Sequence, residues 1–386
     1  MLLIFPVSLL CLLVAGLYAQ DLLRDARAPQ LAPGPGLPRG GPLISVLIPA
    51  RDEAARLGGC LDGLARQSYR DFEVIVVDDH SSDGTAGLAR GYAGQLPGLA
   101  VLPGAALPPG WAGKCWACWQ AAGQARGEWL LFLDADVLPA PELLAALLAR
   151  ADARALALLT LLPLQRMGSP AERVVLPAFF ALLTSLYPLD QVSDAGSPIA
   201  FANGPCLLIR RDAYAAVDGH RAVRASILED TELGQRVKAA GFAIEAAHAP
   251  DLIAVRMYAG WRSLAEGLSK NAVAGYRSGG ARSAWVGLRQ ALAGFTPWYL
   301  LGLGALLAAA RPQSALGGVL LAHGAGLLLL ALACWGRLAA RRYRVPAWRG
   351  ALLPLGTAAY FGLAAWGLLR LRLGRGVSWK GRTFRA

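Results

Sequence analysis

The chain has 386 residues, of which 55% are hydrophobic and only 17% are charged, and its formal net charge is +12. This composition is too apolar for an ordinary soluble protein and predicts a globular domain joined to membrane segments. Sixteen of the 38 basic residues and none of the acidic ones follow Glu266. Because this basic excess lies in apolar sequence, we expect it to contact a membrane surface, and nucleic acid is excluded as a partner.

The N-terminal segment is apolar. Residues 2–19 are long enough to cross a bilayer, so a transmembrane helix is expected over 1–20. No positively charged stretch precedes it, which argues against a cleaved signal peptide. Arg24 and Arg27 follow, and the positive-inside rule then places the next domain in the cytoplasm. Residues 21–42, which become rich in Pro and Gly, are predicted to be a linker.

Residues 43–270 have the pattern of an α/β domain. Apolar runs predict buried strands at 43–50, 72–79, 99–104 and 128–136, and helices are expected between them near 52–67, 82–93 and 113–126. Strands that alternate with helices predict a mainly parallel, Rossmann-like sheet with helices on both faces. Ligands of such sheets bind beyond the carboxyl ends of the strands.

Acidic side chains stand at two of these strand ends. Asp78 and Asp79 end one run, and Asp134 and Asp136 end the run "LFLDADVLP". Alternate side chains of an extended chain point to one side, so we expect the second pair of carboxylates to lie together. Such a pair suits Mg²⁺ or Mn²⁺ bridging to phosphate, and the cation would offset charge on a phosphate leaving group.

Two other interpretations of this aspartate pair are open. It could be an ordinary capped turn, or the nucleophile strand of a haloacid-dehalogenase phosphatase. In such a phosphatase the strand usually stands near the start of its domain. Here two βα units precede it, which counts against that interpretation.

Two further segments also place acidic side chains just after an expected strand or at the expected start of a helix. The run "SVLIPARDE" (45–53) ends a strand in a turn that carries Arg51 and Glu53. The run "SILEDTELGQRV" (226–237) places Glu229 and Asp230 at the expected start of a helix. Acids at that position are favoured by the helix dipole alone, and they could equally include a general base.

Taken together, these segments resemble the family-2, GT-A-type glycosyltransferases. The resemblance runs from Ile44 to Asn271 and includes "VVDDHSSDGT", "GKCWACWQAAGQARGEWLLFLDADVLPAPE", "NGPCLLIRRDAYAAVDGH" and "LEDTELGQRVKAAGF" in the family's order. It implies a GT-A nucleotide-sugar-binding domain and a sugar transfer from a nucleotide donor.

The resemblance also implies roles for single residues. Pro49, Arg51 and Glu53 would form the first nucleotide-binding loop, Asp78 and Asp79 would bind the uracil and ribose, and Lys114 and Asp134 would help to hold the nucleotide. Asp136, with Asp134, would bind the cation on the diphosphate. Asp230, beside Glu229, would be the catalytic base that takes a proton from the acceptor hydroxyl.

One departure from the family is informative. Processive members carry a QxxRW motif after the catalytic acid, and the region 253–271 lacks it, which favours transfer of a single sugar. The runs "LPPGWAGKCWA", "VRMYAGW" and "SWKGRTF" resemble the membrane-bound branch that includes hopanoid-associated and carotenoid glycosyltransferases. A second group of residues could bind the acceptor or the diphosphate, or could instead anchor the protein at the membrane interface. These candidates are Arg256, Trp261, Trp379, Lys380 and Arg382.

A C-terminal membrane region is expected over 285–386. Its apolar stretches lie at about 291–310, 315–336 and 350–369, and it ends in a basic tail. The arginines of 337–349 and of the tail both favour the cytoplasm, so the last stretch, with Pro354 and Gly356, is a candidate re-entrant or interfacial segment. Residues 174–189 are apolar but short, and predict either a core helix or an interfacial helix that presents a lipid.

We therefore expect a multi-pass protein of the cell (inner, cytoplasmic) membrane with its catalytic domain in the cytoplasm. It would transfer one sugar, with inversion, from a UDP-sugar to a lipid acceptor such as a carotenoid or hopanoid-type isoprenoid, using Mg²⁺ or Mn²⁺. Transfer to polyprenyl phosphate, or a membrane lipid transporter with a degenerate GT-A domain, are the alternatives. The intact acids Asp79, Asp136 and Asp230 argue against degeneration.

Overall fold

The structure is a computed structural model that describes residues 4–34, 40–379 and 382–384. The chain divides into two compact units. An α/β unit comprises Ala28–Arg166 and Tyr187–Met257, and a helical unit comprises Met1–Arg27, Met167–Leu186 and Tyr258–Ala386. The helical unit is thus assembled from three separate segments of the chain.

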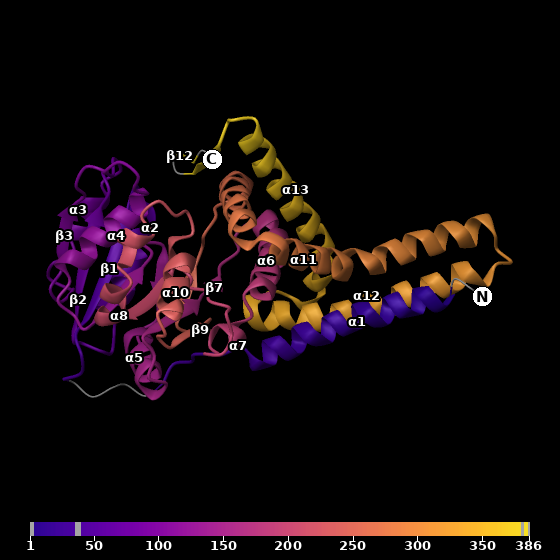
Figure 1. The fold of residues 1–386 in the computed structure, drawn as a ribbon, viewed down its shortest axis with the longest axis horizontal. Coiled ribbons are helices and arrows are strands. Elements are labelled where there is room, and N and C mark those ends of the chain that lie inside the picture. Colours follow the sequence, from indigo (N-terminus) through magenta and orange to yellow (C-terminus); the bar gives the residue numbers. More distant parts are fainter. Residues whose placement is uncertain (1–3, 35–39, 380–381, 385–386) are drawn as a thin grey trace. The chain divides into compact units, whose positions relative to one another are not determined.

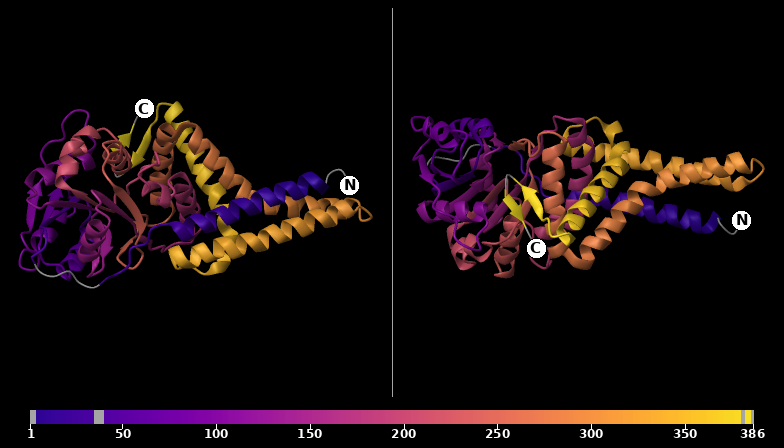
Figure 2. Two further views of the ribbon diagram at one scale, coloured as in Figure 1. Left: turned by 60° about the horizontal axis from the view of Figure 1, so that its bottom comes forward. Right: turned by 90° about the horizontal axis from the view of Figure 1, so that it is seen from above.

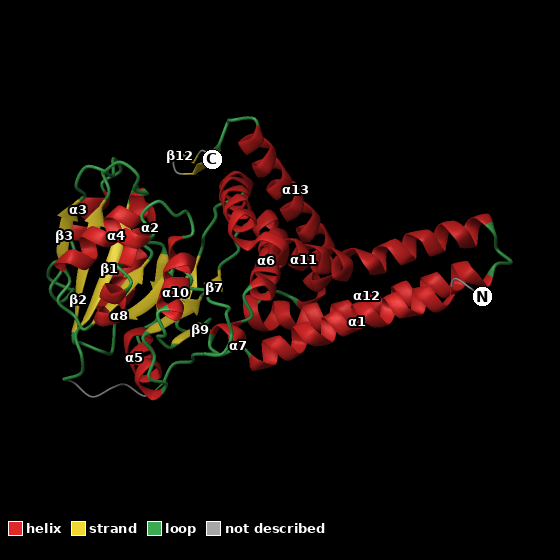
Figure 3. Ribbon diagram, viewed as in Figure 1, coloured by secondary structure: helices red, strands yellow, loops and turns green. Residues whose placement is uncertain are grey.

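A seven-stranded sheet forms the centre of the α/β unit (Figure 3). β8 runs antiparallel to its neighbours β4 and β6, and the other neighbouring strands are parallel. The prediction of a mainly parallel sheet with helices is confirmed. In spatial order the strands are β3 (Ala100–Pro103), β2 (Phe72–Asp78), β1 (Ile44–Ala50), β4 (Trp129–Leu133), β8 (Cys206–Arg210), β6 (Leu158–Leu162) and β9 (Ile244–His248).

The remaining elements of this unit surround the sheet (Figure 1). The helices are α2 (Ala54–Ala65), α3 (Thr85–Arg90), α4 (Gly113–Gln124), α5 (Leu143–Ala153), α7 (Leu189–Val192), α8 (Arg211–Ala216), α9 (Gly219–Ala222) and α10 (Glu229–Ala239). A small second sheet joins β5 (Val137–Pro139), β10 (Ile253–Val255) and β7 (Leu164–Gln165). Val46, Leu47 and Ile48 of β1 are all fully buried. Both faces of this central strand are covered, which is why its sequence is continuously apolar rather than alternating.

The expectation that Asp134 and Asp136 share one side of an extended strand is wrong. β4 ends at Leu133, and the N–H of Val137 donates to the carbonyl of Asp134 at 3.1 Å. Asp134 and Asp136 therefore lie in a turn. The chain turns there because it must enter β5, which pairs with β10 in the second sheet.

Among its described residues, the helical unit has four helices that are long and apolar enough to cross a membrane (Figure 2). These stretches are Phe5–Arg27, Gly280–Ala310, Ala315–Tyr343 and Ala347–Arg372. Gly280, with φ +48°, interrupts the helical geometry of the long helix over Trp261–Ala310 at the point where the second stretch begins. The elements of the unit are α1 (Ile4–Arg27), α6 (Pro170–Leu186), α11 (Trp261–Ala310), α12 (Ala315–Tyr343), η1 (Ala347–Leu352), α13 (Leu353–Arg372), β11 (Val377–Trp379) and β12 (Arg382–Phe384).

Two elements differ from the boundaries expected from sequence. The first helix continues to Arg27, seven residues into the expected linker. The acidic residues Asp21 and Asp25 are accommodated in this helix because their charges are paired: Asp21 with Arg289 of α11, and Asp25 with Arg342 of α12. The apolar segment near 174–189 forms α6, which belongs to the helical unit and packs on α13 and α11.

Candidate active site

A pocket in the α/β unit lies beyond the ends of β1 and β4. It brings together residues from six separate segments of the chain. Pro49, Lys114, Phe132, Asp134, Gly204, His220, Glu229 and Asp230 are among those that line it. Four predicted site residues with charged side chains, and Pro49, therefore share one location. This is the place at which α/β sheets bind their ligands.

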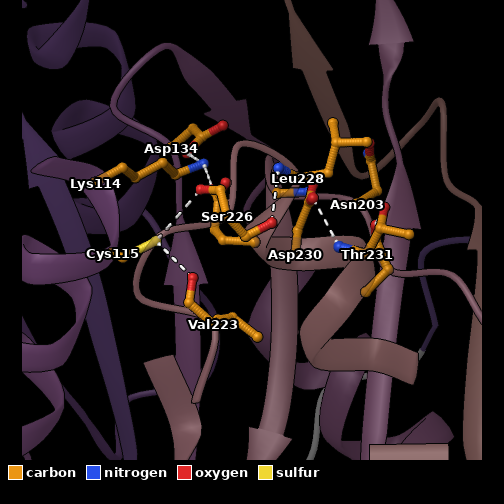
Figure 4. A network of polar contacts seen from close by, with 12 residues as sticks. Lys114, Cys115, Asp134, Asn203, Val223, Ser226, Leu228, Asp230 and Thr231 are labelled. Carbon is orange, nitrogen blue, oxygen red and sulfur yellow. Dashed lines mark hydrogen bonds and ion pairs between the residues drawn. The ribbon is translucent and has the colours of Figure 1, made fainter. Parts of the chain in front are cut away.

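Lys114 is the ionic centre of the pocket (Figure 4). Its ammonium lies 2.8 Å from Oδ1 of Asp134 and 3.0 Å from Oε1 of Glu229. Burial opposes the charge, but the two carboxylates hold the pKa of the Lys114 ammonium well above its usual value. One cation thus joins the end of β4 to the start of α10.

The loop before α10 is fixed against the start of α4. The N–H of Ala112 donates to the carbonyl of Arg224 at 2.6 Å, and the thiol of Cys115 donates to the carbonyl of Val223 at 3.5 Å. Lys114 stands between these two anchors in the sequence. The same contacts therefore bring Glu229 within reach of its ammonium.

Asp230 is held by backbone amides at the first turn of α10. Its Oδ2 accepts from the N–H of Gly204 at 2.6 Å, and its Oδ1 accepts from the N–H of Thr231 at 2.7 Å (Figure 4). Burial, and then the negative charge of Glu229, raise the pKa of the Asp230 carboxyl to about 6, although Lys114 and both amides act in the opposite direction. A carboxyl with this pKa can exchange a proton near neutral pH.

Gly204 permits the close approach of these groups. A Cβ at this position would lie 2.9 Å from Nζ of Lys114 and 3.0 Å from Oδ2 of Asp230. The turn that carries it is anchored to β6, because the hydroxyl of Thr160 accepts from the N–H of Asn203 at 2.9 Å and donates to the Cys206 carbonyl at 2.9 Å. Sequence reasoning missed Gly204, although the "NGP" run was a signal for a tight turn.

The loops after β1 and β2 are joined to each other. Arg51 lies 3.6 Å from the carboxylate of Asp79. The N–H of Glu53 donates to the hydroxyl of Thr85 at 2.9 Å, and Asp52 accepts from the N–H of Ser82 at 2.8 Å. These contacts join the two loops that carry Arg51, Glu53 and Asp79, the residues that the family resemblance assigns to the nucleotide.

Asp78 and Pro49 lie within strands and not in the loops that follow them. Asp78 is the last residue of β2, and its Oδ1 is buried without a hydrogen-bond partner among the described residues. Pro49 lies within β1 and not in a turn, where it pairs with β2 only, since the β1–β4 pairing stops at Leu47. Its missing N–H therefore costs no hydrogen bond in the ladder.

Asp134 and Asp136 have the donor chemistry that ligands of a divalent cation require. Both are partly exposed and offer carboxylate oxygens, the donors that Mg²⁺ and Mn²⁺ prefer. The described residues contain no group of three or more His, Cys, Asp or Glu side chains gathered for a metal. Mg²⁺ is commonly held by one or two carboxylates together with substrate phosphates, so this donor pair fits such an ion.

The residues predicted for the acceptor or diphosphate side belong to other segments of the chain. Arg256 follows β10 and is exposed. Trp261 begins α11 of the helical unit and is 53% exposed, and Trp379 and Arg382 face each other in the register of the β11–β12 hairpin. Lys380 lies outside the described residues.

Comparison with known families bears on the segment that builds most of this pocket. Residues 45–217 match the model of the family "Glycosyl transferase family 2". The chain carries a family-2 glycosyltransferase domain. The segment runs from the start of β1 to the end of α8, so it supplies Lys114, Asp134 and Gly204, while Asp230 follows it in sequence.

Curated relatives of this glycosyltransferase domain are named 4,4'-diaponeurosporenoate glycosyltransferase. The protein of Staphylococcus haemolyticus is 31% identical over 245 residues, which cover 61% of this chain and 62% of that protein. The protein of Staphylococcus aureus (strain USA300) is 30% identical over 244 residues, which cover 59% of this chain and 60% of that protein. The aligned region thus spans about three fifths of the length of these relatives.

A solved structure shares the fold. The mannosyltransferase PcManGT from Pyrobaculum calidifontis, described in complex with GDP-Man and Mn²⁺, superimposes with a TM-score of 0.54. It is 21% identical, and the alignment covers 94% of this chain and 99% of that one. The GT-A fold expected from the sequence is therefore confirmed.

Proposed function

We propose that the protein transfers one sugar, with inversion, from a nucleotide-sugar to a lipid acceptor. The observation that carries this proposal is the pocket in which the strand-end carboxylate Asp134, the cation Lys114 and the carboxyl of Asp230 meet. Lys114 and the loops of Arg51 and Asp79 would bind the nucleotide diphosphate. A UDP-sugar is the donor that we expect.

The proposed chemistry is a single displacement. Asp230, held by the amides of Gly204 and Thr231, would take the proton of the acceptor hydroxyl while that oxygen attacks the anomeric carbon. The bond from the anomeric carbon to the diphosphate breaks, and the configuration inverts. Asp134 and Asp136 would hold Mg²⁺ or Mn²⁺, which when bound offsets the charge that develops on the leaving diphosphate.

The proposal of a lipid acceptor rests on different observations. In the described part of the helical unit, four helices are long and apolar enough to cross a membrane, and curated relatives are named 4,4'-diaponeurosporenoate glycosyltransferase. We therefore propose an isoprenoid-type acceptor, and a cell-membrane protein whose catalytic domain faces the cytoplasm. The cytoplasmic placement follows from Arg24 and Arg27 in the last turn of α1 and from the arginines in 337–349.

Turnover by the purified protein in detergent tests the proposal. UDP-sugars and a total lipid extract are supplied with and without Mn²⁺, and the wild type is compared with Asp136→Ala and Asp230→Asn. The exposed Asp152→Asn on α5 serves as the matched control. We expect a glycolipid product that needs the metal, is lost in Asp136→Ala, falls about 10²–10⁴-fold in Asp230→Asn and persists in the control.

Two outcomes would contradict parts of the proposal. If no UDP-sugar binds or turns over with any lipid or metal, the donor assignment fails and a degenerate domain becomes the better interpretation. If Asp230→Asn retains nearly full activity, the acceptor is already ionised, which points to a carboxylate or to a polyprenyl phosphate instead of a hydroxyl. Mass spectrometry of the product identifies the acceptor in either case.

A further inference from the structure

One buried side chain of the pocket has no part in the chemistry proposed above. His220, on the short helix α9, is 3% exposed and also lines the pocket of Lys114 and Asp230. Its ring packs against those of Phe132 and Tyr214, with centroid distances of 4.6 and 5.7 Å, and these two rings also contact each other at 5.5 Å. The packing fixes the plane of the imidazole.

Hydrogen bonds to Tyr214 determine which ring nitrogen carries the proton. The backbone N–H of His220 donates to the hydroxyl oxygen of Tyr214 at 3.1 Å, and this hydroxyl lies 2.9 Å from Nδ1 of His220. The hydroxyl hydrogen of Tyr214 has no other acceptor among the contacts of the described residues. Tyr214 therefore donates to Nδ1, and the single proton of the neutral ring is on Nε2.

The backbone around this pair reinforces the arrangement. Gly219 has φ +44°, and a Cβ there would lie 2.2 Å from the ring of Tyr214. A side chain at this position would push Tyr214 away from His220. Burial, and then the nearby ammonium of Lys114, lower the pKa of His220 to about 3, so the ring stays neutral at physiological pH.

We infer that the Nε2–H of His220 donates a hydrogen bond to an uncharged oxygen of the donor sugar, and that Tyr214 is the residue that positions it. Nε2 lies on the side of the ring away from Nδ1 and Tyr214, and His220 is a lining residue of the pocket that holds Asp230. This inference rests on the proposed function, since it needs a nucleotide-sugar in that pocket.

The charge state of the ring favours the sugar over the diphosphate. A diphosphate is best bound by cations, and Lys114 with a divalent ion already supplies them. A histidine that is kept neutral suits a hydroxyl or ring oxygen. The base Asp230 must also stand close to the anomeric carbon, which places the sugar in the pocket that His220 lines.

Binding measurements on the full chain in detergent test this assignment. UDP and a UDP-sugar that the wild type uses are titrated by calorimetry into the wild type, His220→Phe and His220→Gln. We expect His220→Phe to weaken binding of the UDP-sugar about tenfold and to leave binding of UDP unchanged, because one hydrogen bond is lost. The amide nitrogen of His220→Gln can replace Nε2 and should recover part of the loss.

An NMR measurement tests the tautomer without substrate. In protein labelled with ¹⁵N-histidine we expect a protonated Nε2 and an unprotonated Nδ1 for His220 at neutral pH, and a mixture of tautomers in Tyr214→Phe. An imidazolium, or a proton on Nδ1 in the wild type, would overturn the inference, as would equal weakening of UDP and UDP-sugar in His220→Phe. If the wild type binds no nucleotide-sugar, the proposed function fails and the sugar assignment with it, whereas the tautomer is still decided by the NMR spectrum.

Discussion

At the scale of single residues, the pKa of Asp230 makes the proposed mechanism testable. A carboxyl acts as a base only when it is ionised, and burial with the charge of Glu229 raises this pKa to about 6. We therefore expect kcat/KM to be constant above about pH 7 and to fall tenfold per pH unit well below pH 6. The measurement is the pH profile of kcat/KM with saturating metal.

Glu229→Gln provides the informative comparison for this profile. The change removes the negative charge beside Asp230 and also frees Lys114, and both effects favour the ionised form of Asp230. The midpoint of the acidic limb should move to lower pH. Asp230 is not the titrating base if the acidic limb of the wild-type kcat/KM profile has its midpoint near pH 4. The same conclusion follows if the midpoint does not move in Glu229→Gln.

At the scale of elements, Glu172 joins the first turns of two helices in the helical unit. It is fully buried at the start of α6, where it accepts from the hydroxyl of Ser169 at 2.7 Å and the N–H of Gly168 at 2.6 Å. It also accepts from the N–H of Gly260 at 2.8 Å, the residue before α11. The Ser169–Glu172 pair is a capping box that serves a second helix as well.

Replacing Glu172 should therefore cost more than the loss of one cap. In Glu172→Ala the N–H groups of Gly168 and Gly260 lose this buried acceptor, and about 1–3 kcal/mol of stability should be lost for each group left unsatisfied. The control Ser169→Ala should cost only about 1 kcal/mol. Unfolding in detergent, followed by circular dichroism, compares the two variants. Equal losses of unfolding free energy would mean that the hydrogen bond from Gly260 to Glu172 contributes no stability.

Elements differ in how far the sequence could predict them. The strands ending near Ala50, Asp78 and Leu133 were predictable, because continuous apolar runs ended in acids. The antiparallel insertion of β8 between β4 and β6 was not, since pairing between segments more than 40 residues apart leaves no local pattern. The length of α1 depends in the same way on distant partners.

The residues of the candidate site also differ in whether the sequence could predict them. Asp134 and Asp230 were candidates because acids stand at strand and helix ends, and Lys114 was implied by the resemblance to family-2 glycosyltransferases. His220 and Gly204 were not, because their importance depends on contacts with Tyr214, Lys114 and Asp230 that exist only in the folded chain. A buried histidine in an aromatic environment has no distinctive spacing in sequence.

At the scale of the whole molecule, the first helix is joined to segments more than 260 residues away by charged pairs. Asp21 of α1 pairs with Arg289 of α11, and their side chains are only 8% and 4% exposed. Arg289 also donates to the Leu17 carbonyl at 3.1 Å and to the hydroxyl of Ser185 at 3.3 Å. Asp25 of α1 lies 2.5 Å from Arg342 of α12, which makes a second link.

A double-mutant cycle at Asp21 and Arg289 tests whether this link holds α1 in the bundle. Asp21→Leu or Arg289→Leu alone leaves one buried charge uncompensated and should cost about 3–5 kcal/mol of the free energy of unfolding. The double variant should be more stable than either single variant, because no unpaired charge remains. The exposed pair Arg262–Glu266 is the matched control, since its i,i+4 interaction should contribute only about 0.3–0.5 kcal/mol. Unfolding of each variant in detergent gives the four free energies. If the losses of the two single variants simply add in the double variant, the pair does not couple α1 to α11, and the helix is held by apolar packing and by the Asp25–Arg342 pair.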